Sequence, residues 1–111
     1  MEIKELKSIL DTVIVNNRKL PSAYHSFKAS GKTDIPDLPY IIYFVDSVDV
    51  KGADNKVKYK ENRYIIELYT ATKSVVTEEI LEKILDDNNI FYEKIESYID
   101  TENMYQIVYK I

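Results

Sequence analysis

A chain of 111 residues has room for one domain and one hydrophobic core, because single domains cluster near about 100 to 150 residues. Its net charge of −4 comes from interspersed acidic and basic side chains, so it offers no basic field that would bind a nucleic-acid backbone tightly. The absence of cysteine excludes disulfides, thiolate zinc sites and cysteine nucleophiles.

The N-terminal segment, Met1 to Glu5, has no apolar core of the kind found in signal peptides. No window approaches the roughly 18 apolar residues needed to cross a bilayer. We therefore expect a soluble protein that is made in the cytosol.

The first predicted element is an amphipathic helix from Glu2 to about Val15. Its apolar residues recur at spacings of three and four, at Ile3, Leu6, Leu10, Val13 and Ile14. The pair Asn16-Asn17 predicts its end near Asn16. Residues 17–38 contain two prolines, one glycine and many small polar residues, so we expect a long connection without regular structure.

Two long antiparallel strands are predicted next. Pro39 can begin a strand, the apolar run from Tyr40 to Val45 follows it, and the alternation continues to Val50. Residues 51–61 are mostly charged or small and predict a flexible tip, after which Arg63 to Tyr69 returns to strand.

The last third predicts a helix and a hairpin. Thr77 is the expected N-cap of the helix, which ends at Asn88-Asn89. Strands are expected at 91–99 and 104–111 around a turn at 100–103. The order α-β-β-α-β-β predicts a single α+β domain over residues 1–111, with two helices packed on an antiparallel sheet.

Candidate catalytic groups are few. His25 lies between Ser22 and Ser26, but neighbouring serines in sequence do not make a triad, so a loop or packing role is the favoured interpretation. With only Gly31 and Gly52, the chain cannot form a phosphate-binding glycine loop.

Two groups of acidic residues are candidates for a metal or catalytic site. Asp46, Asp49 and Asp54 do not fit the spacing of a calcium loop, so turn and solvation roles are favoured. The second group lies on or near the final hairpin and consists of Glu93, Glu96, Asp100 and Glu102. Glu93 and Glu96 differ in strand parity, so they point to opposite faces and do not form a glycosidase pair.

Five segments spread over nearly the whole chain carry a family resemblance. They are Leu20 to His25, Leu38 to Tyr43, Gly52 to Lys56, Tyr64 to Tyr69 and Met104 to Tyr109. In these segments the chain resembles small tail-completion proteins of siphophages and prophages of Gram-positive bacteria. None of the segments has catalytic meaning.

The resemblance implies a tail terminator or head-tail joining protein without enzymatic activity, cofactor or metal. Such proteins form a ring of identical α+β subunits, commonly a hexamer, on the head-proximal end of the tail tube. The implied partners are the tail tube protein and the head completion or connector protein, with DNA passing through the lumen without specific binding and with no membrane contact. The implied location is the tail-head junction of the virion, after assembly in the host cytoplasm.

A ring needs a patch on one subunit that binds a different patch on its neighbour. Extended loops suit this purpose, so the segment from Val50 to Glu61 is the first candidate for contact with the tube or a neighbour. Its candidate residues are Val50, Lys51, Gly52, Ala53, Asp54, Asn55, Lys56 and Lys58. A second candidate loop contains Lys28, Gly31, Lys32 and Asp34.

The alternative function is a small non-enzymatic module that binds a ligand or RNA. Lys56, Lys58 and Lys60 alternate with Val57 and Tyr59, which places three lysines on one face of a regular strand. Lysines on an edge strand also prevent aggregation, and the negative net charge favours that interpretation.

Overall fold

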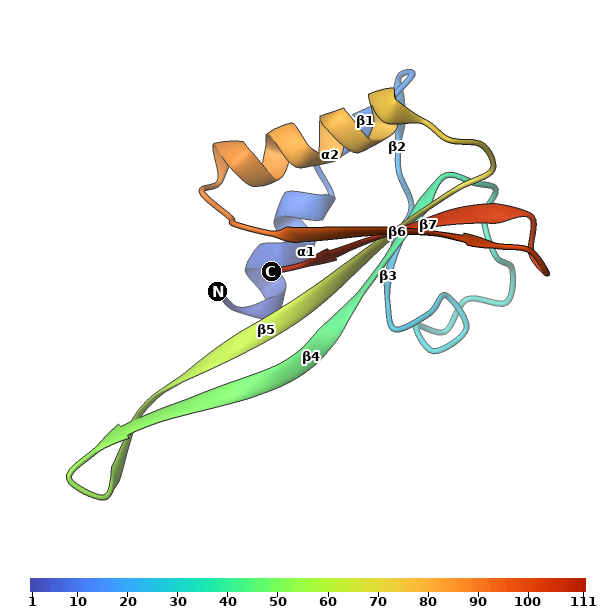
Figure 1. Cartoon of the computed structure of the whole chain (residues 1–111). Coiled ribbons are helices and arrows are strands. Elements are labelled where there is room, and N and C mark those ends of the chain that lie inside the picture. Colours follow the sequence, from blue (N-terminus) through green and yellow to red (C-terminus); the bar gives the residue numbers. More distant parts are fainter.

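A five-stranded sheet with both helices against one of its faces organises the chain, and the computed structural model describes all of residues 1–111 (Figure 1). The helices are α1 (Ile3–Leu10) and α2 (Val75–Asp87). The strands of the sheet are β3 (Ser22–Tyr24), β4 (Tyr40–Ala53), β5 (Lys56–Thr70), β6 (Glu93–Ile99) and β7 (Met104–Lys110). A separate ribbon pairs β1 (Ile14–Val15) with β2 (Arg18–Lys19). Neither helix has the length and apolar character of a membrane span.

The strands lie in the order β3-β4-β5-β7-β6, and the sheet is mixed. Strands β4, β5, β7 and β6 pair antiparallel as predicted, but β3 pairs parallel with β4. A parallel pair needs a crossover of about a dozen residues or more, and the connection at residues 25–39 provides it. The α+β class is therefore confirmed, whereas the wholly antiparallel sheet is wrong and the predicted order lacks three short strands.

The core fills the space between the helices and one face of the sheet. Alternation along each strand sends every second side chain to this face, as at Tyr64, Ile66 and Leu68 on β5. The other fully buried members are Leu6, Leu10, Val13, Leu20, Ile41, Leu81, Leu85, Ile107 and Tyr109. No helix covers the opposite face, which we call the open face.

The first helix is shorter than its apolar spacing predicts. It ends at Leu10, and residues 14–19 form the β1–β2 ribbon. Asn16 and Asn17 have φ angles of 53° and 62°, the left-handed conformation required at the turn of a two-residue hairpin. Val13 is buried as the apolar spacing predicts, but Ile14 is 56% exposed, so beyond Leu10 the predicted element type was wrong and the predicted apolar face was right only at Val13.

The second helix begins earlier than predicted. Ser74 is its N-cap, and the Ser74 hydroxyl oxygen accepts a hydrogen bond from the backbone N–H of Thr77 at 3.3 Å. Thr77, the predicted cap, lies buried within the first turn. The helix ends at Asp87, next to the predicted Asn88-Asn89 stop.

The predicted flexible tip is a regular hairpin. Strand β4 continues to Ala53 and β5 begins at Lys56, leaving only Asp54 and Asn55 in the turn. Their φ angles of 53° and 61° are those of a type I′ turn, whose twist matches that of the flanking strands. Aspartate and asparagine tolerate this conformation better than most residues.

Candidate functional site

The hairpin of β4 and β5 extends well beyond the rest of the sheet (Figure 1). Strand β3 pairs with β4 only as far as Tyr43, and β7 pairs with β5 only from Ile65 onward. Residues 47–63 therefore form a two-stranded ribbon with both outer edges unpaired, which we call the arm. The unpaired backbone groups along both edges are free to pair with another chain.

Apolar side chains are exposed along the arm. The exposed fractions are 47% for Val48, 54% for Val50, 64% for Val57 and 57% for Tyr59. Val48 and Val50 alternate on β4, and Val57 lies opposite Gly52, so the three valines share one face of the ribbon. Contiguous exposed apolar residues among charged ones are typical of an interaction surface.

The lysines of the arm do not form a single row. Lys51 pairs with Tyr59 but Gly52 pairs with Val57, which leaves Lys58 as the extra residue of a bulge. Lys60, opposite Val50, therefore shares the face of Val57, and Lys56 lies on the other face. The predicted three-lysine face is wrong because the bulge interrupts the strict alternation.

Charge is distributed unequally between the arm and the body. Residues 51–60, which we call the arm tip, contain four lysines and one aspartate, a net charge of +3. Because the whole chain carries −4, the remaining residues carry −7. All residues of the arm tip are exposed, including the predicted contact residues Lys51 to Lys56 and Lys58.

Gly52 is required by the geometry of the arm tip. A Cβ atom at this position would lie 2.6 Å from the backbone oxygen of Lys56. That separation is shorter than any real contact, so a larger residue would force the two strands apart next to the turn. Gly52 thus has a structural role within the predicted contact segment.

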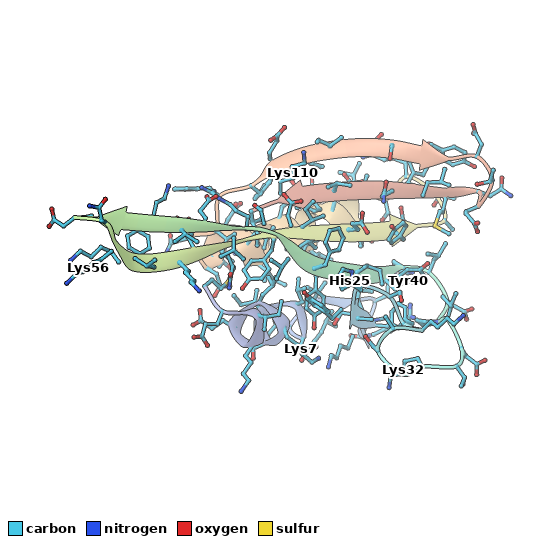
Figure 2. The ribbon with its side chains drawn as sticks, turned by 90° about the horizontal axis from the view of Figure 1, so that it is seen from below. Lys7, His25, Lys32, Tyr40, Lys56 and Lys110 are labelled. Carbon is cyan, nitrogen blue, oxygen red and sulfur yellow. The ribbon has the colours of Figure 1, made fainter.

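The second candidate loop lies at the other end of the molecule. Figure 2 shows Lys32 far from Lys56 and on the same side as His25 and Tyr40. A backbone hydrogen bond from the N–H of Lys32 to the oxygen of Phe27 closes the loop at 2.8 Å, and buried Phe27 holds it against Tyr40. Lys28, Gly31, Lys32 and Asp34 are all exposed.

A cavity of about 400 Å³ lies between this loop and the open face. Side chains of the sheet line it at Tyr40, Ile42, Glu67, Tyr69 and Met104. Loop and turn residues, among them His25, Ile35 and Glu102, complete the lining. We call this hollow the open-face cavity; it combines apolar and aromatic walls with two carboxylates.

Glu67 is a half-buried carboxylate in the cavity wall. Its oxygens accept hydrogen bonds from the Tyr69 hydroxyl at 3.1 Å and from the Gln106 amide at 3.0 Å. Burial raises the pKa of Glu67, although the Tyr69 bond opposes the shift. The pKa of Tyr69 is raised to about 12, chiefly by burial and secondly by the nearby charge of Glu67. The arrangement places a carboxyl group with two hydrogen-bond donors on a largely apolar face.

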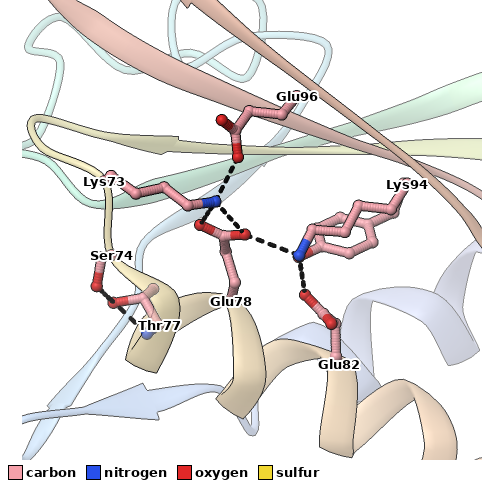
Figure 3. Close-up of polar contacts among 8 residues, drawn as sticks. Lys73, Ser74, Thr77, Glu78, Glu82, Lys94 and Glu96 are labelled. Carbon is pink, nitrogen blue, oxygen red and sulfur yellow. Dashed lines mark hydrogen bonds and ion pairs between the residues drawn. The ribbon is translucent and has the colours of Figure 1, made fainter.

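A second cluster of charges joins α2 to β6, and Figure 3 shows its ion pairs. Glu78, only 2% exposed, lies 2.7 Å from Lys73 Nζ and 2.8 Å from Lys94 Nζ. Lys73 also pairs with Glu96, and Lys94 lies 2.8 Å from Glu82, which accepts a hydrogen bond from buried Tyr109. The cluster pairs two lysines with three carboxylates from α2, β6 and the segment before α2, so it fixes the helix to the sheet.

The pKa values in this cluster follow from burial and pairing. Burial raises the pKa of Glu78, but hydrogen bonds and charges of Lys73 and Lys94 outweigh it, and the net shift is downward. Burial lowers the pKa of Lys94, and its bonds to Glu78 and Glu82 raise it further than burial lowers it. Both groups therefore stay charged at neutral pH.

The structure does not bring together the residues that the sequence offers as catalytic or metal-binding candidates. His25 is exposed and stacks on Phe44 at a ring separation of 5.5 Å, with no hydrogen bond to either serine. Asp49 pairs with Arg63 at 2.9 Å. No three histidine or acidic side chains gather in a metal-binding group.

The acidic residues of the final hairpin also remain apart. Glu96 faces α2 and pairs with Lys73, whereas Glu93 lies opposite Lys110 on the other face of the sheet. Their predicted opposite orientation is confirmed. Glu102 lies at the open-face cavity instead.

Comparison with known proteins gives no further guidance. No protein-family model matches the chain, and no similar sequence is found among curated proteins.

Sequence reasoning missed the open-face cavity. Its signal is Glu67, the one charged residue within the apolar run from Tyr64 to Tyr69. A charged residue in such a strand indicates that its side chain lies on the face away from the core. The hydrogen bond between Glu67 and Gln106 follows from the pairing of β5 with β7, which the sequence does not reveal. The loop wall could not be predicted because it depends on the parallel placement of β3.

Proposed function

We propose that this protein is a non-enzymatic virion protein of the tail-head junction of a siphophage or prophage, which forms a ring that ends the tail tube and joins it to the head connector. The observation that supports the proposal best is the arm, a long ribbon with exposed valines and no partner within the chain. The family resemblance described above supplies the biological setting.

The α+β body provides a rigid base for such an arm. Strands β4 and β5 are buried at Ile41, Tyr43, Ile66 and Leu68, so the part of the hairpin inside the body is held by the core. The same two strands leave the body as the arm. A contact element held at one end and exposed at the other suits an assembly subunit, because little ordering is needed when a partner binds.

The charge of the body also supports the proposal. Outside the arm tip the chain carries a net charge of −7. A ring built from such bodies presents an acidic surface to DNA in its lumen, and like charges keep the duplex from sticking.

Deleting the gene from the phage tests the proposal. We expect tail tubes of uncontrolled length that are not joined to heads, because nothing would stop tube polymerisation. Electron microscopy of lysates measures tube length and head attachment. Plasmid expression of the intact chain serves as the control and should restore uniform tails. Normal tails in the deletion strain would refute the proposal.

RNA binding remains a second candidate because of the +3 charge of the arm tip. It predicts salt-sensitive retention of RNA that is lost in the triple variant of Lys56, Lys58 and Lys60 to glutamate. The distribution of these lysines over both faces of the ribbon favours it less than the assembly role.

A further inference from the structure

We propose that the arm tip of one copy binds in the open-face cavity of a second copy, so that identical subunits join head to tail. The inference rests on the proposed ring and names both halves of its subunit contact.

The arm tip and the open-face cavity lie at opposite ends of the molecule. Figure 2 shows Lys56 at one end of the hairpin and Tyr40 and His25 toward the other. The molecule measures 51 Å along its longest axis and 31 and 26 Å across. Paired strands hold the arm extended, so it cannot bend back to its own cavity. Two different patches at opposite ends generate a ring if the rotation between copies closes.

The charges of the two surfaces are complementary. The arm tip carries +3, and the cavity wall holds Glu67 and Glu102, with Lys28 as its one lysine. The body as a whole carries −7, so the long-range field also attracts the arm tip of a neighbour. A negatively charged ligand, by contrast, would meet these carboxylates.

The apolar surfaces also match. The arm offers exposed Val57 and Tyr59 next to its lysines. The cavity offers Ile42, Tyr40 and Met104, with Ile35 from the loop 69% exposed. Bringing these side chains together removes apolar surface from water on both partners.

A second copy is the occupant that satisfies all of these requirements. The cavity calls for a cationic partner with apolar side chains that projects from its own body. The arm tip has that chemistry, and every copy of the chain carries both surfaces.

Single-cysteine variants test the contact directly, because the natural chain contains no cysteine. An arm variant, Val57→Cys, is mixed with a size-tagged cavity variant, Met104→Cys, with and without tube protein, and treated with a short bismaleimide. The matched control replaces Met104→Cys by Glu79→Cys, an exposed position on α2 on the other side of the sheet. We expect several-fold more arm-to-cavity product than arm-to-helix product. Glu102→Cys serves as a second cavity variant if Met104→Cys does not fold.

Charge reversal adds an independent readout. The double change Lys56→Glu and Lys58→Glu in the arm variant should reduce the crosslinked product several-fold, and Glu102→Lys in the cavity variant should restore part of it. The inference would be overturned if the cavity and control positions gave equal yields of crosslinked product. It would also be overturned if the arm variant crosslinked to the tube protein and not to a second copy of the chain. Overlong tails in the gene deletion together with such a result would leave the proposed function standing. Specific crosslinking together with normal tails would instead refute the function and keep the contact.

Discussion

At the scale of single residues, Glu78 shows how a buried charge is accommodated. Its carboxylate is 2% exposed yet lies within 2.8 Å of two lysines, each of which also contacts a second carboxylate. A buried carboxylate is tolerated only when such partners replace its water. The cluster therefore holds the first turn of α2 against β6.

Replacing Glu78 by glutamine should destabilise the fold by about 2 kcal/mol. The loss is smaller than for an isolated buried pair because Lys73 keeps Glu96 and Lys94 keeps Glu82. Denaturant unfolding measures the change. Asp87→Asn, which removes the exposed pair with Lys83, is the control and should cost well under 1 kcal/mol. Equal effects of the two variants would contradict the buried-pair interpretation.

The stabilising effect of Glu78 should depend on pH. Its pKa lies below the ordinary 4.5 in the folded state, so its contribution is present in full above pH 4.5 and disappears as the pH falls through the folded-state pKa. The difference in unfolding free energy between the natural chain and Glu78→Gln should therefore shrink with acidification. Unfolding curves at a series of pH values measure it; a constant difference would argue against the shift.

Glu67 should show the opposite dependence. Its pKa is raised above 4.5 by burial, so its contribution to stability is present below pH 4.5 and is lost as the pH rises through the folded-state pKa. Relative to the natural chain, Glu67→Gln should thus gain stability between acidic and neutral pH. Carbon NMR titration of the Glu67 carboxyl checks the pKa directly, and a midpoint at or below the ordinary value would contradict the prediction. Glu5→Gln on the exposed surface of α1 is the matched control.

Residue patterns predicted burial better than they predicted partners. Leu6, Leu10 and Val13 lie on the apolar face that their spacing predicts, and all three are fully buried. The pairing of Glu67 with Gln106 links positions far apart in the chain, so only strand neighbourhood reveals it.

At the scale of elements, the arm is a β-hairpin whose composition conceals its regularity. Eleven mostly charged or small residues predict a flexible loop, yet the turn needs only Asp54 and Asn55. Cross-strand backbone pairing does not depend on apolar side chains, so charged strands leave a weak signal in sequence. The predicted end of α1 was wrong for a related reason. The helical spacing of apolar residues continues to Ile14, but the Asn16-Asn17 turn pairs residues 14–15 with 18–19 as a β-ribbon.

Replacing Gly52 by alanine should distort the arm tip without unfolding the body. The new Cβ would lie 2.6 Å from the Lys56 oxygen, so we expect amide protection to be lost at residues 50–60. The core residues should keep their protection because none contacts the arm tip. Hydrogen exchange followed by NMR measures both regions, with Ala53→Ser as the control. Unchanged protection at the tip would show that the two strands can separate without cost.

At the scale of the whole molecule, the α+β class and the major elements were predictable, whereas the mixed sheet was not. Strand β3 contains only three residues, too few for a periodic pattern, and its parallel pairing depends on the course of residues 25–39. The arm and the open-face cavity occupy opposite ends because of that arrangement.

Replacing residues 48–62 by Asn-Gly should separate folding from assembly. Ser47 and Arg63 are opposite each other in the ladder, so a two-residue turn can join them. We expect the free energy of unfolding to stay within about 1 kcal/mol of the full chain, because no residue of 48–62 is buried and one side-chain hydrogen bond, from Asn62 to the Tyr64 hydroxyl at 3.0 Å, joins this segment to the core. Denaturant unfolding and complementation of the phage deletion measure the two properties. A truncated chain that restored uniform tails would show that the arm is dispensable.

The β-bulge at Asp46 affects the direction in which the arm leaves the body. Val45 pairs with Tyr64 and Ser47 with Arg63, so Asp46 is an extra residue where the arm leaves the body. Bulges bend and twist the strand that carries them. In the head-to-tail ring that we propose, that bend would help to set the angle between successive subunits, and the angle decides how many of them complete a circle. A single extra residue where the arm leaves the body would then affect the symmetry of the ring.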